Sequence, residues 1–292
     1  MRKILIGLLF ILSVNVVSAV DVYNMDELNN ALVDNCSYIF VHEGNYVISQ
    51  LNIPEGKYIK GEGISTIFVQ DDNCSGYGLG ITDNTILEDV VYVGNNNTLA
   101  THGIRIDGNN VKINRVKVSH TVHHGITSVS GSDNVSIIDC TVSNTGCINT
   151  QDGAGIIVNG KNCIVTDNKV FNTAYHGIQA YTNSQNCIIS NNHVVDCGNN
   201  LRSGGSKGAG IKSSTGCCLI NINGNNIVNQ YGEGILLDDC DECIVDGNII
   251  TNATRGIYEK NSGKCLINDN LVLRSRDNGI YLYQSNTSYL PQ

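Results

Sequence analysis

Four eight-residue segments superpose without gaps: CIVTDNKV at Cys163–Val170, CIISNNHV at Cys187–Val194, CIVDGNII at Cys243–Ile250 and CLINDNLV at Cys265–Val272. A unit this short cannot bury its apolar side chains alone, so such units stack on one another around a continuous core. Because like positions then lie above one another at ~4.8 Å, the Asn residues are expected to form a hydrogen-bonded column. The column comprises Asn168, Asn192, Asn225, Asn248 and Asn270, and Arg115 and Cys140 are placed at the same position in two earlier units.

A Gly-Ile pair recurs in phase with these segments and marks a further strand of each unit. The pairs begin at Gly80, Gly103, Gly125, Gly155, Gly177, Gly210, Gly234, Gly256 and Gly279. Their spacing is 22 to 24 residues apart from two insertions, at 143–153 and 196–208, which fall at the same corner of the unit. Insertions confined to one corner are typical of a solenoid. The sequence therefore predicts an all-β fold with three short strands per coil and inward files of Ile, Val, Leu and Cys.

The segment before the repeats predicts a short helix. Asn24 followed by Glu27 has the pattern of an N-cap with an acidic residue three positions later, and Leu28, Ala31 and Leu32 follow at helical spacing. We expect a helix over about 25–34 that covers the first coil, because a parallel solenoid otherwise exposes strand edges at its ends.

Further motifs carry a resemblance to a known fold. The helix, Tyr38–Val41 (YIFV), Glu43–Tyr46 (EGNY), Ile59–Gly63 (IKGEG) and the coils resemble the pectate-lyase-like superfamily of right-handed parallel β-helices over about residues 22–285. The resemblance implies one right-handed parallel β-helix domain over 20–292, and the Asn column matches the asparagine ladder of that superfamily. Its members include lyases, hydrolases, epimerases and non-catalytic surface proteins, so the fold alone does not select a function.

The first 19 residues have the pattern of a signal peptide. Arg2 and Lys3 precede a short apolar stretch, and the small residue Ala19 precedes the expected cleavage point. A membrane anchor is the alternative, but the stretch is short for a span. Removing these residues leaves 16 basic against 27 acidic side chains, a net charge of 16 − 27 = −11. We expect a secreted or cell-surface monomer without membrane insertion after cleavage, and the negative charge disfavours nucleic acid as a partner.

The twelve cysteines admit three interpretations. Those that begin the four repeated segments share an inward position and are expected to be packed, free thiols. Cys217 and Cys240 occupy equivalent positions in adjacent coils and are the best candidates for a disulfide. A zinc site formed by Cys217, Cys218, Cys240 and Cys243 is disfavoured, because adjacent cysteines are poorly spaced for tetrahedral ligation.

Polar residues collect on the outward side of the Gly-Ile strands, beside the insertions. Abstraction of the C5 proton of a uronic acid requires a base, a proton donor and a cation that neutralises the carboxylate. The candidate catalytic residues are His124 or His176 as base, Tyr181 as proton donor, Asp152 to orient a histidine or bind a cation, and Lys212 as carboxylate clamp. The candidate substrate-binding residues are Arg105, Gln179, Arg202 and Tyr258. The alternative for the histidines is that they cap backbone carbonyls at strand starts.

Extracellular polysaccharide is the expected partner, and two main hypotheses remain. The first is a lyase or C5-epimerase of uronic-acid polymers. The second is a non-catalytic surface or matrix protein that binds carbohydrate or has a structural role. A periplasmic role in metal or cofactor handling is a third. No cofactor is required by the sequence, although Asp238 and Asp239 could contribute oxygen ligands to Ca²⁺ or be solvated turn residues.

Overall fold

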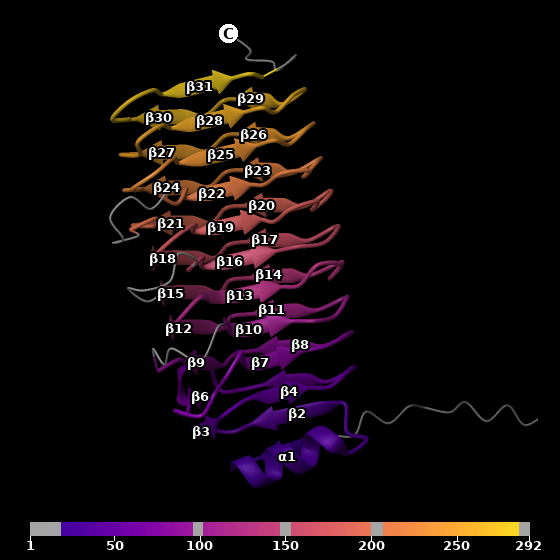
Figure 1. Ribbon diagram of the computed structural model, residues 1–292. Helices are drawn as coiled ribbons and strands as arrows, with labels where there is room; N and C mark the ends of the chain where they lie inside the picture. The colour runs from indigo at the N-terminus through magenta and orange to yellow at the C-terminus, as the bar shows by residue number, and fades with distance from the viewer. Residues whose placement is uncertain (1–18, 96–101, 147–152, 200–206, 286–292) are drawn as a thin grey trace, which may run out of the picture.

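The computed structural model describes residues 19–95, 102–146, 153–199 and 207–285. In these ranges the chain winds into a stack of coils whose strands form three parallel sheets (Figure 1). Sheet A contains β1 (Ala19–Val22), β2 (Tyr38–Val41), β5 (Tyr58–Lys60), β8 (Ile86–Glu88), β11 (Lys112–Asn114), β14 (Ser136–Ile138), β17 (Ile164–Thr166), β20 (Ile188–Ser190), β23 (Asn221–Asn223), β26 (Ile244–Asp246) and β29 (Leu266–Asn268).

The other two sheets complete each coil. Sheet B contains β3 (Gly44–Ile48), β6 (Thr66–Gln70), β9 (Val91–Val93), β12 (Lys117–Thr121), β15 (Thr141–Thr145), β18 (Lys169–Thr173), β21 (His193–Val195), β24 (Asn226–Val228), β27 (Ile249–Thr251) and β30 (Leu271–Leu273). Sheet C contains β4 (Leu51–Ile53), β7 (Tyr77–Ile81), β10 (His102–Ile106), β13 (His124–Ser128), β16 (Ile156–Val158), β19 (Ile178–Ala180), β22 (Ile211–Ser213), β25 (Ile235–Asp238), β28 (Ile257–Lys260) and β31 (Ile280–Tyr283). The predicted all-β parallel β-helix is confirmed.

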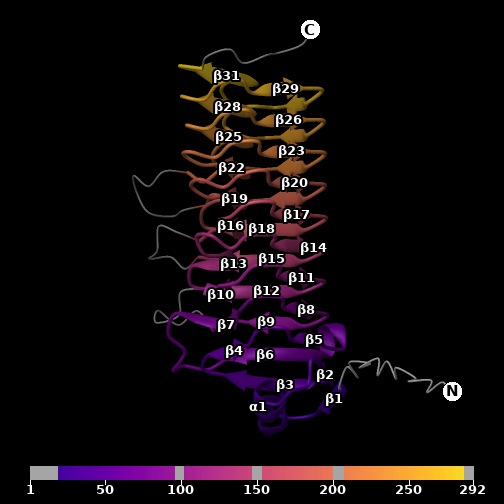
Figure 2. The same ribbon diagram turned by 90° about the vertical axis from the view of Figure 1, so that its right-hand side faces the viewer.

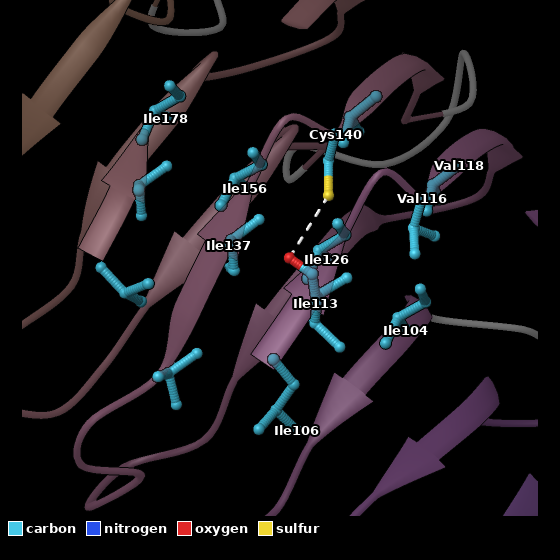
Figure 3. Close-up of a cluster of buried hydrophobic side chains, with 14 of the residues drawn as sticks. Ile104, Ile106, Ile113, Val116, Val118, Ile126, Ile137, Cys140, Ile156 and Ile178 are labelled. Atoms are coloured by element: carbon cyan, nitrogen blue, oxygen red, sulfur yellow. Dashed lines mark hydrogen bonds between the residues drawn. The ribbon is translucent and has the colours of Figure 1, made fainter. Parts of the chain in front are cut away.

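The core consists of vertical files of small and branched apolar side chains. Ile104, Ile126, Ile156 and Ile178 are paired from strand to strand in sheet C and are fully buried. Figure 3 shows this file facing Ile113, Ile137 and Cys140 from the other walls of the coil. Each fully buried side chain of this size contributes about 2 kcal/mol relative to an exposed one, so the stack is held together along its whole length.

The Asn column is confirmed. The Nδ2 groups of Asn168, Asn192, Asn225 and Asn248 each donate to the Oδ1 of the next Asn along the axis, at 2.8–3.0 Å. Cys140 continues the column, because its backbone N–H donates to Asn168. The placement of Arg115 was wrong by one residue. Arg115 has a φ of 51° in the turn, and Val116, which is buried, lies beneath Cys140 because Lys117 pairs with Thr141.

One Gly-Ile pair lies out of phase. Leu79 pairs with Ile104, and Gly80 pairs with Arg105, so Gly78 and not Gly80 is the equivalent of Gly103. The reason is packing of an aromatic ring: a Cβ at position 78 would collide with the ring of Tyr92. The strand therefore begins two residues earlier than the sequence repeat indicates.

A short helix covers the N-terminal end of the stack, as predicted. Helix α1 (Met25–Val33) begins after Asn24, whose side chain accepts from the backbone N–H of Glu27, and it lies at the end of the coils in both views (Figures 1 and 2). A one-turn 3-10 helix, η1 (Gly63–Ser65), follows β5. The Nζ of Lys57, only 6% exposed, donates to the carbonyls of Ala31, Asp34 and Cys36 and so caps the C-terminus of α1.

The eleven described cysteines are free, and ten of them are buried. This agrees with the interpretation of the cysteines as packed, free thiols. The disulfide considered between Cys217 and Cys240 is not present, and Cys147 lies outside the described residues, as do residues 1–18 of the expected signal peptide. Within the described ranges, no helix is long and apolar enough to cross a bilayer.

Candidate functional site

The outward side of sheet C carries an open cavity of about 480 Å³ over β10 to β22. Six of the predicted site residues line it: Arg105, His124, His176, Gln179, Tyr181 and Lys212. Strand pairing explains the position of three of them, because Arg105, Gln179 and Lys212 lie in one register row that also contains Thr127 and Ile157. Asp152 and Arg202 lie outside the described residues. The repeat thus places the proposed groove on one face.

A backbone hydrogen bond fixes the tautomer of two histidines. The N–H of Ala154 donates to Nδ1 of His124 at 3.2 Å, and the N–H of Ala209 donates to Nδ1 of His176 at 2.9 Å. A backbone N–H is always a donor, so each Nδ1 is an acceptor and the proton of the neutral ring is on Nε2. In both cases the donor belongs to the next coil and precedes a Gly-Ile pair, as the histidine itself does.

Burial also keeps these two rings neutral. It lowers the pKa of His124 to about 3, assisted by His102 and His123. Burial likewise lowers the pKa of His176 to about 3, assisted by the Lys212 ammonium. Each ring is therefore an uncharged Nε2–H donor at neutral pH. A base needs a free ring-nitrogen lone pair, and in both rings that lone pair already accepts a backbone N–H.

His102 is a cavity residue that was not nominated from the sequence. Its ring stacks on that of His124 with centroids 5.0 Å apart, and His123 approaches both rings edge-on. Its Nδ1 is buried and has no hydrogen-bond partner in the described structure, so neither tautomer is imposed. Burial, with His123 and Arg105 nearby, lowers the pKa of His102 to about 4. The sequence did contain a signal for His102: it directly precedes Gly103, just as His124 directly precedes Gly125.

The cations of the cavity are held by carboxylates. Arg105 forms an ion pair with Asp107 at 2.8 Å and lies over the ring of Tyr77. The Nζ of Lys212 is 3.1 Å from Asp238 Oδ2, and the Nζ of Lys260 is 2.9 Å from Asp238 Oδ1. Burial acts to raise the pKa of Asp238, but the two lysines outweigh it and lower that pKa. Asp238 is therefore the shared partner of two ammonium groups.

This pairing bears on the suggested Ca²⁺ ligands. Both carboxylate oxygens of Asp238 are engaged by lysines, and a divalent cation there would be repelled by two positive charges. Asp239 is exposed in the following turn, with a φ of 58°. Asp238 is thus better suited to positioning Lys212 than to binding a cation.

A second cavity of about 490 Å³ continues the groove along the axis. It shares Tyr175, His176 and Lys212 with the first and extends to Tyr258 on β28. The predicted residue Tyr258 is therefore on the expected face but not in the histidine cavity. The result is a parallel β-helix with an open, polar groove running along sheet C.

Comparison with known proteins agrees with this class. Residues 150–291 match the family described as periplasmic copper-binding protein (NosD), whereas no curated protein matches the chain. The fold is similar to that of an alginate lyase from Paenibacillus sp. str. FPU-7, with a TM-score of 0.68 and 15% identity, covering 92% of this chain and 99% of that one. Pectate lyase Pel9A has a similar fold, with a TM-score of 0.62 and 13% identity, covering 94% of this chain and 80% of that one.

Tailspike protein 2 of Escherichia coli O157:H7 bacteriophage CAB120 is also similar, with a TM-score of 0.71 and 15% identity over 85% of this chain. The chain spans only 38% of the tailspike's length. At these identities the likeness establishes the fold alone, and the resemblance to pectate-lyase-like β-helices is confirmed at the level of the fold.

The name of the matched family implies copper, and the cavity residues do not fit that ion. A histidine binds copper through a ring-nitrogen lone pair. In His124 and His176, Nδ1 accepts a backbone N–H and Nε2 carries the proton. Among the residues that the structure describes, no group of three or more His, Cys, Asp or Glu is arranged to hold a metal ion.

Proposed function

We propose that the protein binds a uronic-acid polysaccharide along sheet C and acts on it as a lyase or C5-epimerase. The observation that carries the proposal is the combination, in one cavity, of two neutral Nε2–H donors, His124 and His176, with the cations Arg105 and Lys212. A carboxylate is the ligand that such a set recognises. Export to the periplasm, the cell surface or the medium is part of the proposal, in keeping with the expected signal peptide.

Removal of the C5 proton of a uronate builds negative charge on its carboxylate, and preorganised donors lower the barrier by stabilising that charge. In the proposed mechanism Lys212 and the two Nε2–H groups hold the carboxylate. His102 is the base, because its tautomer is not imposed and it can present a nitrogen lone pair. In the lyase reaction the C5–H electron pair forms the C4–C5 double bond, the C4–O4 bond breaks, and Tyr181 protonates the leaving oxygen. In epimerisation His102 keeps the proton that it removes, and Tyr181 delivers a proton to C5 from the opposite face.

The test is a panel of uronate polymers, including mannuronate, guluronate and galacturonate chains, incubated with the purified protein. Formation of unsaturated ends is followed by ultraviolet absorbance and epimer composition by NMR. Loss of one charge-stabilising group costs roughly 10²–10³ in rate, so Lys212→Ala should lose at least a hundredfold. Lys264→Ala, an exposed lysine outside the groove, should retain activity.

Two outcomes would contradict the proposed reaction. One is the absence of product and of epimer change with every polymer. The other is equal activity of Lys212→Ala and the native protein. Binding of a uronate polymer without turnover would instead identify a non-catalytic carbohydrate-binding protein.

A further inference from the structure

The outward face of sheet C carries tyrosines on β28 and β31, in register with Lys212 and Leu236 of the preceding strands. Tyr258 and Tyr281 are paired in register on these strands. Their ring centroids are 5.3 Å apart, and those of Tyr281 and Tyr283 are 6.4 Å apart. Tyr283 is 42% exposed. Three adjacent rings therefore form a partly exposed aromatic surface, which we call the tyrosine platform.

Arg255 fixes the orientation of this platform. Its guanidinium carbon lies 4.7 Å from the ring centroid of Tyr258 and 5.2 Å from that of Tyr281. Glu233 and Asp277 form ion pairs with the same guanidinium at 3.1 and 3.3 Å. The charge of Arg255 is thus balanced and its side chain is held at two points, so the rings are preorganised and lose little freedom when a ligand binds.

The platform is continuous with the proposed catalytic cavity. The second cavity reaches from His176 and Lys212 to Tyr258, and the next strand carries Tyr281. Sheet C runs through eight adjacent strands from β10 to β31, which spans roughly 34 Å at ~4.8 Å per strand. A polysaccharide lying along the axis would therefore meet the histidine cavity and the platform with different sugar residues.

We propose that Tyr258, Tyr281 and Tyr283 form a second subsite, which stacks on pyranose rings of the same polysaccharide several residues away from the reacting uronate. The inference rests on the proposed function. Aromatic side chains offer a large flat apolar area with a polar rim, which matches the apolar C–H face and peripheral hydroxyls of a sugar ring. Because the contact is made by the ring faces, the subsite requires a sugar ring but not a carboxylate.

The experiment compares oligosaccharides of one uronate, from disaccharide to decasaccharide, with native protein and with Tyr281→Ala. Turnover gives kcat/KM for each length, and titration of the His102→Gln variant gives Kd without turnover. An aromatic contact of this kind is worth roughly a 2- to 10-fold change in affinity. We expect Tyr281→Ala to weaken the binding of the decasaccharide by that factor and to leave the binding and turnover of the shortest substrates unchanged. Tyr23→Ala, which removes an exposed stacked tyrosine at the other end of the molecule, is the matched control.

Equal Kd and kcat/KM values for native protein and Tyr281→Ala at every oligosaccharide length would overturn the subsite. An equal loss of affinity for short and long chains would overturn it as well. The two proposals fail differently. Turnover that does not depend on chain length would support the proposed reaction and contradict the subsite. Binding that depends on chain length and on Tyr281, without turnover, would support the subsite and contradict the proposed reaction.

Discussion

Single hydrogen bonds determine what the groove histidines can do. The backbone N–H groups of Ala154 and Ala209 occupy the Nδ1 lone pairs of His124 and His176, so both rings are donors toward the groove. Glutamine places an N–H donor near the position of Nε2 but is not a base. We therefore expect His124→Gln to retain activity within about tenfold, whereas His124→Ala should lose roughly 10²–10³ in kcat/KM.

Steady-state kinetics on the most active uronate polymer measures this difference, with circular dichroism to confirm folding. If the glutamine variant is as inactive as the alanine variant, His124 acts as a base and not as a donor. His193→Gln, on the outward side of sheet B and exposed, is the control that should change nothing.

The low pKa values of these histidines also predict how stability depends on pH. An unfolded histidine titrates near pH 6.5, whereas burial lowers the pKa of His124 and His176 to about 3 in the folded protein. Between these values the unfolded chain binds more protons, so their contribution to stability is complete above about pH 6.5 and is lost as the pH falls toward 3. Urea unfolding measured from about pH 7 to 4.5 should show this decline.

The control for the pH series is the double variant with Gln at both positions. It should show a shallower decline than the native protein over the same range. Identical slopes would mean that the two rings take up protons in the folded state over the same pH range as in the unfolded chain, contrary to their burial and to the tautomer that the backbone imposes.

At the scale of a structural element, the asparagine ladder ties neighbouring turns together. Asn192 is 1% exposed, donates to Val165 and Asn225, and accepts from the backbone and side chain of Asn168. Replacing it with Ala leaves several of these buried groups without partners, at about 1–3 kcal/mol for each. We expect Asn192→Ala to lower the free energy of unfolding by about 3 kcal/mol or more, measured by urea denaturation.

The matched control is another stacked asparagine pair. Asn252 donates to Asn229 at 3.0 Å on the exposed surface, where water replaces a lost partner. Asn252 has a φ of 57°, which glycine adopts without strain, so Asn252→Gly should change stability by no more than ~0.5 kcal/mol. Equal effects of the two substitutions would mean that the buried ladder is not a source of stability.

Sequence periodicity predicts the elements well and their exact phase less well. The Asn column followed directly from the repeat, because its members have the same neighbours in every unit. The phase failed at Gly80, where a local contact overrides the repeat because the ring of Tyr92 requires Gly at position 78. The placement of Arg115 was a misalignment by one residue, because the repeat counted from Val111 puts Val116 at the column position, as the strand pairing does. The tautomers of His124 and His176 could not be predicted either, because they depend on which backbone N–H the fold brings to each ring.

At the scale of the whole molecule, the protein is a one-dimensional stack in which each coil contacts its neighbours. In such architectures stability is the sum of coil and interface contributions, and regions of low stability open first. The N-terminal coils are covered by α1, in which Leu28 is fully buried. Toward the other end of the described structure, β30 and β31 have mostly exposed side chains. Opening of the stack should therefore begin among the C-terminal coils.

The buried cysteines provide a readout of this order. Cys74 lies among the N-terminal coils, Cys163 in the middle, and Cys265 next to β29, and each is at most 1% exposed. A buried thiol is inert until its coil opens. During pulsed alkylation at intermediate urea, followed by mass spectrometry, we expect Cys265 to be labelled before Cys163, and Cys163 before Cys74. Cys218, which is only partly buried, should react without denaturant. Simultaneous labelling of all three buried thiols would show that the stack unfolds as a single cooperative unit, and labelling that begins at Cys74 would show that the helix end is the weaker one.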